Sequence, residues 1–523
     1  MFFLNLLVFI LVLGVIILIH ELGHFIFAKR AKILCHEFSI GMGPAIYQKR
    51  RGETLYSIRS IPIGGYVSMA GEAINDALIK KDQVIGVKLN QQGQVIEINL
   101  VDSLESDLIG IVKAFDLYGK DFDPLFIELD VNGENKHLSV LRDAIYRLSP
   151  KREMWITPSE KSFESKTLWQ RFLVIFAGPF MNFVLAFVLF LIVGFFVLKP
   201  NLESSEVDYV GENTPASSTG LKQGDQITAI NGLPITSWTD LSNVMKNLDS
   251  PNLSLSYTRD SQSFDDINTV AAVIIQSAGF TNVSEDGTIY SDDPIVGEVS
   301  GRAQSDGGLA SGDLITHLIQ GDTTVQISSW DDIIAFFRTH TRGKVTIRYE
   351  RDDTSKDATF DLISERALGK LGYQAIVFQI GVTPTSNFNL GYTLLYPFRS
   401  IGGDVMQVVN TLGLLFDRQE NLGIGDLSGP VGIFTLVSRT TSQGFLSILG
   451  FTAFLSINIG LLNLLPIPAL DGGRLVFLGV EAITRKPLNR KLENTINSIV
   501  FFLLMGLFIF VTYNDILRII RGW

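Results

Sequence analysis

His20, Glu21 and His24 have the types and spacing of residues that bind a metal and catalyse hydrolysis. They form a His-Glu-x-x-His pattern at the end of an apolar run, residues 2–19. In a helix, positions i and i+4 lie on one face, so both imidazoles can bind one zinc ion beside Glu21, which would act as a general base. With only six histidines in 523 residues, chance explains the pattern poorly. The spacing predicts metallopeptidase chemistry.

The apolar run places this chemistry in a membrane. A charged side chain at the centre of a span costs roughly 2.5–3.5 kcal/mol, so such residues are seldom found there without a function. A secretory signal is the alternative, but the run lacks a basic start and an Ala-x-Ala-like cleavage site. The chain is 46% hydrophobic and 19% charged, which predicts a mixed membrane protein with a few spans and soluble modules.

About four transmembrane helices are expected, separated by other segments. The expected order is helix 1–28 with His-Glu-x-x-His, a membrane-associated β-hairpin region 29–73, an inserted cytoplasmic soluble segment 74–165, helix 172–198, β-rich repeats 199–292 and 293–385, an interfacial amphipathic helix 388–416, helix 445–472 and helix 497–513. In the second helix, small residues and Asn182 indicate close helix packing.

Basic residues set the expected orientation. Residues 29–60 hold seven Lys or Arg against two Glu, and the positive-inside rule places such a segment in the cytoplasm. The acidic stretch 199–300 would then lie on the outer side. This predicts a multi-pass membrane protein, with the metal site near the cytoplasmic side and the repeats extracytoplasmic.

The region 29–73 is expected to contain short strands separated by Gly and Pro turns. Such strands near the metal could offer an edge to an extended peptide, and a plain cytoplasmic hairpin is the alternative. The insert carries two hairpin patterns, at 84–100 and at 125–141 around Asn132-Gly133. No catalytic cluster is visible in the insert.

Two copies of one module follow the second span. The stretch 220–227 is repeated at 308–315, and the Ser-Trp motif of Trp238 is repeated at Trp330. Two copies about 90 residues apart indicate tandem domains. Each resembles a PDZ domain, which can take a peptide as an added strand. Spacers without a ligand are the alternative.

Asp471 is the expected third metal ligand. Near it, Pro466, Pro468 and the Gly472-Gly473 pair interrupt the third span, and a broken helix is tolerated in lipid only where it lines a protein cavity. A carboxylate buried there needs a cation, and zinc held by the two histidines would supply it. Capping of the next helix is the alternative.

Other classes of site and partner are excluded. A formal charge of −11 and the lack of a basic tract argue against nucleic-acid binding. The single cysteine, Cys35, excludes intrachain disulfides and a cysteine-only metal site. Membrane lipid is an expected partner.

In combination, these motifs are similar to those of the bacterial site-2 protease family. The similarity rests on His-Glu-x-x-His, Gly64-Gly65-Tyr66, Ala177-Gly178-Pro179 with Asn182, the PDZ-like pair and the Asn463 to Gly472 motif, in that order. It implies cleavage of single-span substrates, such as an anti-sigma factor shortened by a site-1 protease, and clearance of signal-peptide remnants. It also implies that Asn463 binds the substrate backbone and that the PDZ pair filters substrates by ectodomain size. The insert at 74–165 is longer than expected for the family.

The predicted function is an intramembrane zinc metalloendopeptidase, with His20, His24 and Asp471 as ligands and Glu21 as catalytic base. A membrane-tethered PDZ scaffold with a vestigial metal site is the alternative. All three ligands and the base are present, which counts against it. A transporter is disfavoured by having only four spans and no repeat among them.

Overall fold

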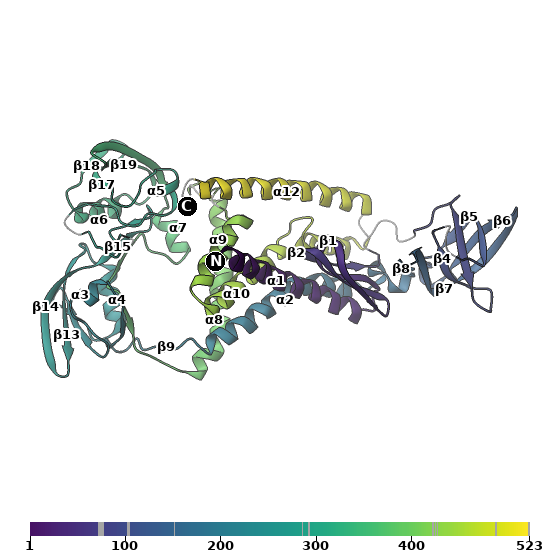
Figure 1. Ribbon diagram of the computed structural model, residues 1–523, viewed down its shortest axis with the longest axis horizontal. Helices are drawn as coiled ribbons and strands as arrows, with labels where there is room; N and C mark the ends of the chain where they lie inside the picture. The colour runs from purple at the N-terminus through teal and green to yellow at the C-terminus, as the bar shows by residue number, and fades with distance from the viewer. Residues whose placement is uncertain are drawn as a thin grey trace. The chain divides into compact units, whose positions relative to one another are not determined.

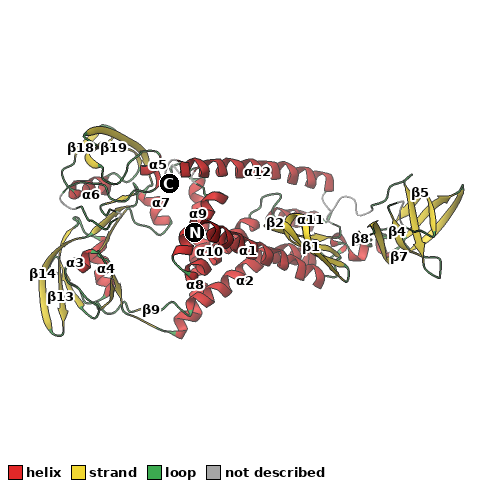
Figure 2. Cartoon of the chain, in the orientation of Figure 1, coloured by secondary structure: helices red, strands yellow, loops and turns green. Residues whose placement is uncertain are grey.

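The computed structural model describes residues 1–71, 78–101, 105–150, 152–284, 286–290, 293–420, 423, 425, 427–486 and 489–520 (Figures 1 and 2). Four described helices are long and apolar enough to cross a membrane: α1 (Phe2–Arg30), α2 (Leu168–Gly194), α10 (Phe445–Leu464) and the Lys491–Arg518 part of α12 (Arg490–Ile520). With its β-sheets, the chain is the mixed membrane protein that was predicted. It divides into two compact units, Met1–Leu189 with Leu436–Gly506 and Phe190–Thr435 with Leu507–Trp523.

The third span is shorter than its prediction. α10 ends at Leu464, and Asp471 begins a separate helix, α11 (Asp471–Thr484). The expectation of one helix over 445–472 was therefore wrong at its end. Pro466 and Pro468 explain the break, because proline lacks the backbone N–H and disfavours helical geometry in the residue before it.

A folded hairpin follows α1 in the first unit. Strands β1 (Cys35–Arg51) and β2 (Thr54–Met69) are antiparallel and longer than the short strands predicted. Residues 37–40 of β1 pair with 55–58 on one side and with 65–68 on the other. Among the described pairings, the segment 65–69 is bonded along one side only, so it is an edge of this sheet.

The insert forms a sheet with its own core. Its strands lie in the order β4-β3-β5-β6-β7-β8, and an additional parallel pairing of β4 with β7 closes the sheet on itself. Both predicted hairpins are present, as β3–β4 and β6–β7. The strands are β3 (Val84–Leu89), β4 (Val95–Asn99), β5 (Leu108–Asp116), β6 (Phe126–Val131), β7 (Glu134–Ser149) and β8 (Arg152–Trp155). Three short 3-10 helices follow β5 and β8: η1 (Lys120–Phe122), η2 (Ser159–Lys161) and η3 (Phe163–Ser165).

The two repeats share one topology in the second unit. Each has a four-stranded sheet, in the order β12-β11-β13-β14 in the first and β18-β17-β19-β20 in the second. Helices α4 (Trp238–Lys246) and α6 (Trp330–Thr339) begin at the repeated tryptophans. The remaining elements of the copies are β10 (Val207–Val210), α3 (Pro215–Ser218), β11 (Gln226–Ile230), β12 (Leu233–Pro234), β13 (Asn252–Arg259), β14 (Gln262–Val270), α5 (Gly301–Ser305), β17 (Leu314–Gln320), β18 (Thr323–Gln326), β19 (Gly343–Arg351) and β20 (Thr354–Leu362).

Strands from the end of the repeat region return to the first copy. β21 (Ile376–Gln379) pairs with β15 (Ala272–Ile275), and β22 (Val382–Pro384) pairs with β10. Buried residues of both copies belong to one hydrophobic cluster. Hydrogen-bonded strands therefore pair across the domain boundary that was predicted between residues 292 and 293. The smaller elements here are β16 (Phe280–Thr281), α7 (Glu365–Lys370), β23 (Ser386–Asn387) and β9 (Lys199–Pro200), the last two being paired.

Two further helices belong to the region after the repeats. α8 (Leu390–Leu415) covers the predicted interfacial segment and contains Pro397; its placement at a membrane surface stays a prediction. α9 (Pro430–Ser442) was not predicted. The Asp515 carboxylate of α12 accepts a hydrogen bond of 2.8 Å from the Gly432 amide, so it satisfies a free N–H in the first turn of α9.

One buried ion pair is built in the same way in both repeats. Asp225 and Asp313, each 1% exposed, follow the repeated glycine and accept bidentate hydrogen bonds from Arg259 and Arg351 at 2.6–2.7 Å. Burial alone would raise the pKa of Asp225, but the hydrogen bonds from Arg259 and from the Lys222 amide lower it overall. The carboxylate is therefore ionised at neutral pH.

Asp225→Ala is expected to destabilise the first repeat more than the loss of an exposed ion pair does, because it removes a buried acceptor that binds both the Arg259 guanidinium and the Lys222 amide. Hydrogen-exchange mass spectrometry of the full chain would show faster exchange in β11 and β13. Asp357→Ala is the matched control, since its pair with Arg348 is exposed and is expected to contribute about 1 kcal/mol or less. Equal effects of the two substitutions would contradict this expectation.

Candidate active site and metal centre

One face of α1 carries both imidazoles. The buried residues of this helix recur every three or four positions, at Phe9, Val12, Ile16, His20, Gly23, His24 and Ala28. This is the helical period, so the histidines continue an apolar stripe that faces the rest of the first unit. A Cβ added to Gly23 would lie 2.3 Å from the Ala177 carbonyl oxygen. Glycine at this position therefore lets α1 and α2 approach closely.

The structure brings Asp471 to the two histidines. Asp471 Oδ2 lies 3.1 Å from His20 Nε2 and 3.4 Å from His24 Nε2, and the two Nε2 atoms are 3.2 Å apart. Among the described residues, these three form the group of ligand-type side chains close enough to hold one metal ion. The two segments are 447 positions apart in the chain, counting from His24 to Asp471.

The broken span positions Asp471. Ala469 has φ +71°, and its N–H donates a 3.0 Å hydrogen bond to Asn497 Oδ1. A Cβ added to Gly472 would lie 2.0 Å from the Leu465 carbonyl oxygen, and one on Gly473 would lie 2.4 Å from that of Ile467. Only glycine permits this close packing of α11 on the loop. Asp471 is the first residue of α11, with Leu470 as N-cap and no side-chain cap hydrogen bond, so the capping alternative does not describe it.

The contacts of the two Nδ1 atoms determine which nitrogen of each imidazole faces the cluster. His24 Nδ1 lies 2.8 Å from the Val174 carbonyl oxygen, which can only accept, so Nδ1 carries the proton and Nε2 is free to bind a metal. His20 Nδ1 lies 3.3 Å from the amide nitrogen of Asn182. The nitrogen and oxygen of an amide exchange places on a half-turn, and only the oxygen can accept from Nδ1–H. Asn182 is 0% exposed, and its Oδ1 has no other partner among the described residues.

Asn182→Leu is expected to weaken zinc binding by about 10- to 100-fold, the usual effect of losing a residue that orients a ligand. Competition titration with a zinc chelator would measure it. Asn458→Leu is the matched control, because Asn458 lies on α10 and, among the described residues, its amide donates to the Phe454 carbonyl one turn away. Equal zinc affinity in the two variants would remove Asn182 from this role.

Glu21 and Asn463 line the same cavity as the three ligands. This cavity has a volume of about 220 Å³, and Tyr66 and Val67 of β2 also line it. A Cβ added to Gly65 would lie 3.4 Å from Glu21 Cγ, so the sheet edge 65–69 passes close to Glu21. All five predicted site residues therefore meet at one cavity of the first unit.

The cluster fits a zinc ion. Four ligand atoms at 2.0–2.1 Å in a tetrahedron lie about 3.3 Å from one another, and the three distances here are 3.1, 3.2 and 3.4 Å. Asp471 Oδ2 is buried and accepts no hydrogen bond from the described residues. A buried carboxylate oxygen that faces two unprotonated nitrogens needs a cation. Two imidazoles and one carboxylate are also a donor set of catalytic zinc sites.

Sequence reasoning missed two features of this site. Asn182 was interpreted as a packing residue, although a single amide in an apolar span is itself a signal of a buried polar partner. The Val174 carbonyl is a backbone group and has no signal in the sequence. A Cβ added to Gly178 would lie 2.2 Å from His24 Nε2, which gives that glycine a function in admitting the imidazole.

Comparison with known proteins agrees with this geometry. The model of peptidase family M50 matches residues 8–507. Proteins named zinc metalloprotease RasP from Shouchella clausii, Oceanobacillus iheyensis and Bacillus licheniformis are 30%, 30% and 31% identical to the chain. Each alignment covers 98% of this chain, and 99%, 98% and 98% of the respective relatives. The chain therefore belongs to peptidase family M50, the site-2 protease family, and is a zinc metalloprotease with membrane-spanning helices.

Proposed function

We propose that this zinc metalloprotease is an intramembrane endopeptidase that cleaves single-span membrane proteins. The observation that supports the proposal most strongly is the position of the cluster on α1, a helix of 29 residues that is long and apolar enough to cross a membrane. His20 and His24 lie inside this candidate span, so substrate must reach them at membrane depth. Substrates of the proposed class are anti-sigma-type proteins already shortened outside the membrane, and remnants of signal peptides.

His20, His24 and Asp471 are the proposed zinc ligands, and a bound zinc ion polarises a carbonyl group and lowers the pKa of water toward about 7. Glu21, in the same cavity, takes the proton of the attacking water and returns it to the leaving amine. Asn182 and the Val174 carbonyl hold the imidazoles in the orientation in which Nε2 faces the cavity. These roles need one protonated and one unprotonated nitrogen on each ring.

The sheet edge 65–69 is the proposed docking place for substrate. An α-helix hides its carbonyls in its own hydrogen bonds, so a substrate span must unwind before cleavage. An extended segment can add to a free strand edge through backbone hydrogen bonds, and this edge adjoins Glu21. Asn463, on α10, also lines the cavity. Its amide can form a hydrogen bond with the substrate backbone.

The proposed orientation follows from charge. The basic segment 29–60 would be cytoplasmic by the positive-inside rule, and the repeats would then lie on the outer side of a bacterial inner membrane. There the repeats would exclude substrates with bulky ectodomains. The insert would be cytoplasmic.

Peptide binding by the repeats is a second candidate function, alone or beside proteolysis. A cavity of about 530 Å³ lies between α4 and β21 and is lined by Leu241, Met245 and Phe378. Among the described pairings, β21 is bonded only to β15, so it offers an edge beside a helix, the arrangement in which PDZ domains add a peptide strand. A pure scaffold would bind peptide here without cleaving it.

The test is cleavage of a tagged single-span substrate by the purified full chain in lipid vesicles. We expect products whose masses place the cut inside the apolar segment, loss of cleavage with a zinc chelator, and recovery when zinc is restored. Substrate binding without products in the zinc-loaded protein would favour the scaffold. Products cut only outside the apolar segment would contradict intramembrane cleavage.

A further inference from the structure

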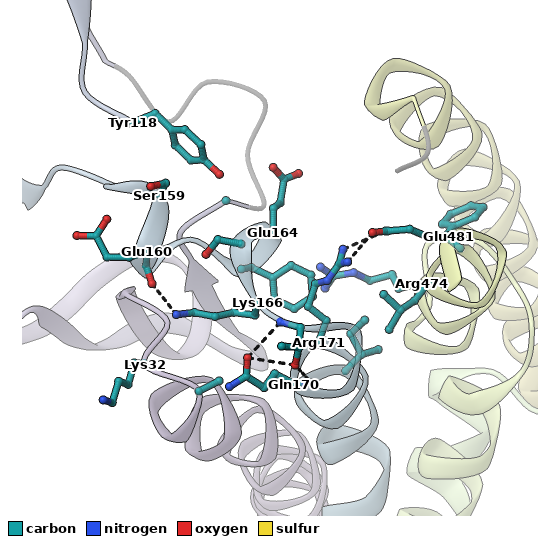
Figure 3. A pocket seen from close by; sticks show the side chains of 18 of the residues that line it. Lys32, Tyr118, Ser159, Glu160, Glu164, Lys166, Gln170, Arg171, Arg474 and Glu481 are labelled. Carbon is teal, nitrogen blue, oxygen red and sulfur yellow. Dashed lines mark hydrogen bonds and ion pairs between the residues drawn. The ribbon is translucent and has the colours of Figure 1, made fainter. Parts of the chain in front are cut away.

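A second and larger cavity, of about 1000 Å³, lies in the first unit at the ends of the helices. It is lined by the end of α1 and the residues after it, by the residues before α2 and the first turns of α2, and by parts of η1, α11 and α12. Figure 3 shows part of this lining, including Lys32, Lys166 and Arg171. None of the proposed ligands, Glu21 or Asn463 lines this cavity, and Arg474 lines both cavities. Its lining therefore has a chemistry of its own to explain.

The lining has an excess of positive charge. Six basic residues face four acidic ones, Arg30, Lys32, Lys120, Lys166, Arg171 and Arg474 against Glu160, Glu164, Glu481 and Glu493. Two of the acids are already paired: Glu481 binds Arg171 in a bidentate pair at 2.5 and 3.0 Å, and Glu160 binds Arg142 outside the lining at 2.5 Å. The lining therefore carries two more basic than acidic side chains, which favours the entry of an anion.

Lys32 and Lys166 are the cations best placed to receive it. Lys166 donates a 2.5 Å hydrogen bond to the Glu160 carbonyl oxygen, and Figure 3 shows Lys32 and Lys166 on the same side of the cavity. Burial, together with the positive charge of Lys32, lowers the pKa of Lys166 although Glu160 opposes the shift. The side chains that the structure describes include no carboxylate in ion-pair contact with Lys32. An anion between the two ammonium groups would relieve their repulsion.

Lys32 also has an unusual backbone conformation. It has φ +56° directly after α1, where helices commonly end with glycine because a side chain costs roughly 1 kcal/mol in this conformation. The chain thus carries a lysine at a position where glycine would be less strained. The first turn of α2 is capped by Thr167 and Gln170, so the side chains, and not this helix end, define the site.

Part of the remaining lining is apolar, beside polar residues such as Ser159 and Gln170, and it lies next to a membrane-interface marker. Phe163, Ile175 and Phe477 line the cavity, and Trp169 in the first turn of α2 is 65% exposed. Tryptophan is enriched where lipid headgroups meet the hydrocarbon. A ligand that fits has a compact anion and an apolar part, and basic pockets between helix ends are suited to lipid phosphates.

We propose that this cavity is a phosphate-binding site between Lys32 and Lys166 that takes the headgroup of an anionic phospholipid. It goes beyond the proteolytic function, because it would fasten the ends of α1 and α2 to the lipid headgroups. Inorganic phosphate offers the same chemical group as the lipid headgroup, and the experiment below distinguishes the two ligands.

The test titrates the detergent-solubilised full chain with short-chain phosphatidylglycerol, with phosphatidylcholine of the same chains, and with inorganic phosphate. We expect phosphatidylglycerol to bind about tenfold more tightly than phosphatidylcholine, and Lys32→Gln with Lys166→Gln to remove that preference. Lys80→Gln with Lys81→Gln is the matched control, since both lysines are exposed and lie outside the lining. It should behave as the unchanged chain.

Three outcomes would overturn the proposal. Equal affinity of the unchanged chain for the two lipids, or an unchanged preference in the Lys32/Lys166 variant, would exclude the anion site. Inorganic phosphate binding as tightly as phosphatidylglycerol would exclude the lipid assignment. Each variant should unfold at the same temperature as the unchanged chain, so that a loss of binding results from the changed site and not from a loss of folding. None of these outcomes depends on cleavage, so the proposal and the proteolytic function fail separately.

Discussion

Glu21→Gln is expected to lower the rate of cleavage by about 10²- to 10⁴-fold, the range that a positioned general base contributes. Glutamine keeps the size of the side chain and its packing near Gly65, but it cannot take a proton from water at neutral pH. The zinc content and the thermal unfolding of the variant should match those of the unchanged chain, because Glu21 is outside the proposed ligand set. Initial rates and elemental analysis on one preparation measure both effects.

Glu203→Gln is the control for this substitution, since Glu203 is exposed and distant in sequence. It should cleave at the unchanged rate. If Glu21→Gln kept its rate within about twofold, the proton would be taken by another group and the proposed role of Glu21 would be wrong. If it instead lost zinc, Glu21 would belong to the metal site.

Asp471→Asn is expected to weaken zinc binding by more than about 100-fold, because residues that only orient ligands already contribute 10- to 100-fold. The amide has nearly the same shape, so the loop and α11 should keep their packing on Gly472 and Gly473. It carries no charge to balance the cation beside two neutral imidazoles. Cleavage should fall in parallel at limiting zinc and partly recover at high zinc.

Asn463→Ala separates this effect from a general disturbance of the cavity, which both residues line. We expect it to retain zinc and to lose cleavage, mainly through weaker substrate binding or orientation. Full zinc occupancy in Asp471→Asn at submicromolar free zinc would contradict the ligand assignment. Zinc loss in both variants would show that the substitutions disturb the cavity as a whole.

The sequence predicted those site residues whose positions follow from helical periodicity or from a buried charge that needs a partner. His20 and His24 share a face because α1 is a regular helix, and their spacing alone predicts this. Asp471 was predicted as their partner because a carboxylate beside a broken span needs a cation. The repeat of the Trp238 motif at Trp330 predicted two copies of one module, and in the structure each tryptophan begins a helix, α4 and α6.

The remaining features depend on contacts between distant segments, which local patterns do not encode. The pairing of β21 with β15 and of β22 with β10 joins strands about 100 to 180 residues apart. The contact of Asn182 with His20 joins two helices. For Asn182 the sequence indicated the polar residue but not its partner.

Zinc K-edge X-ray absorption of the purified full chain tests the central assignment most directly. We predict one zinc ion per chain with imidazole and oxygen ligands at about 2.0–2.1 Å, and loss of part of the imidazole signal in His24→Ala. A spectrum without imidazole scattering, one with a sulfur ligand at about 2.3 Å, or one that His24→Ala leaves unchanged would contradict the assignment of zinc to His20, His24 and Asp471.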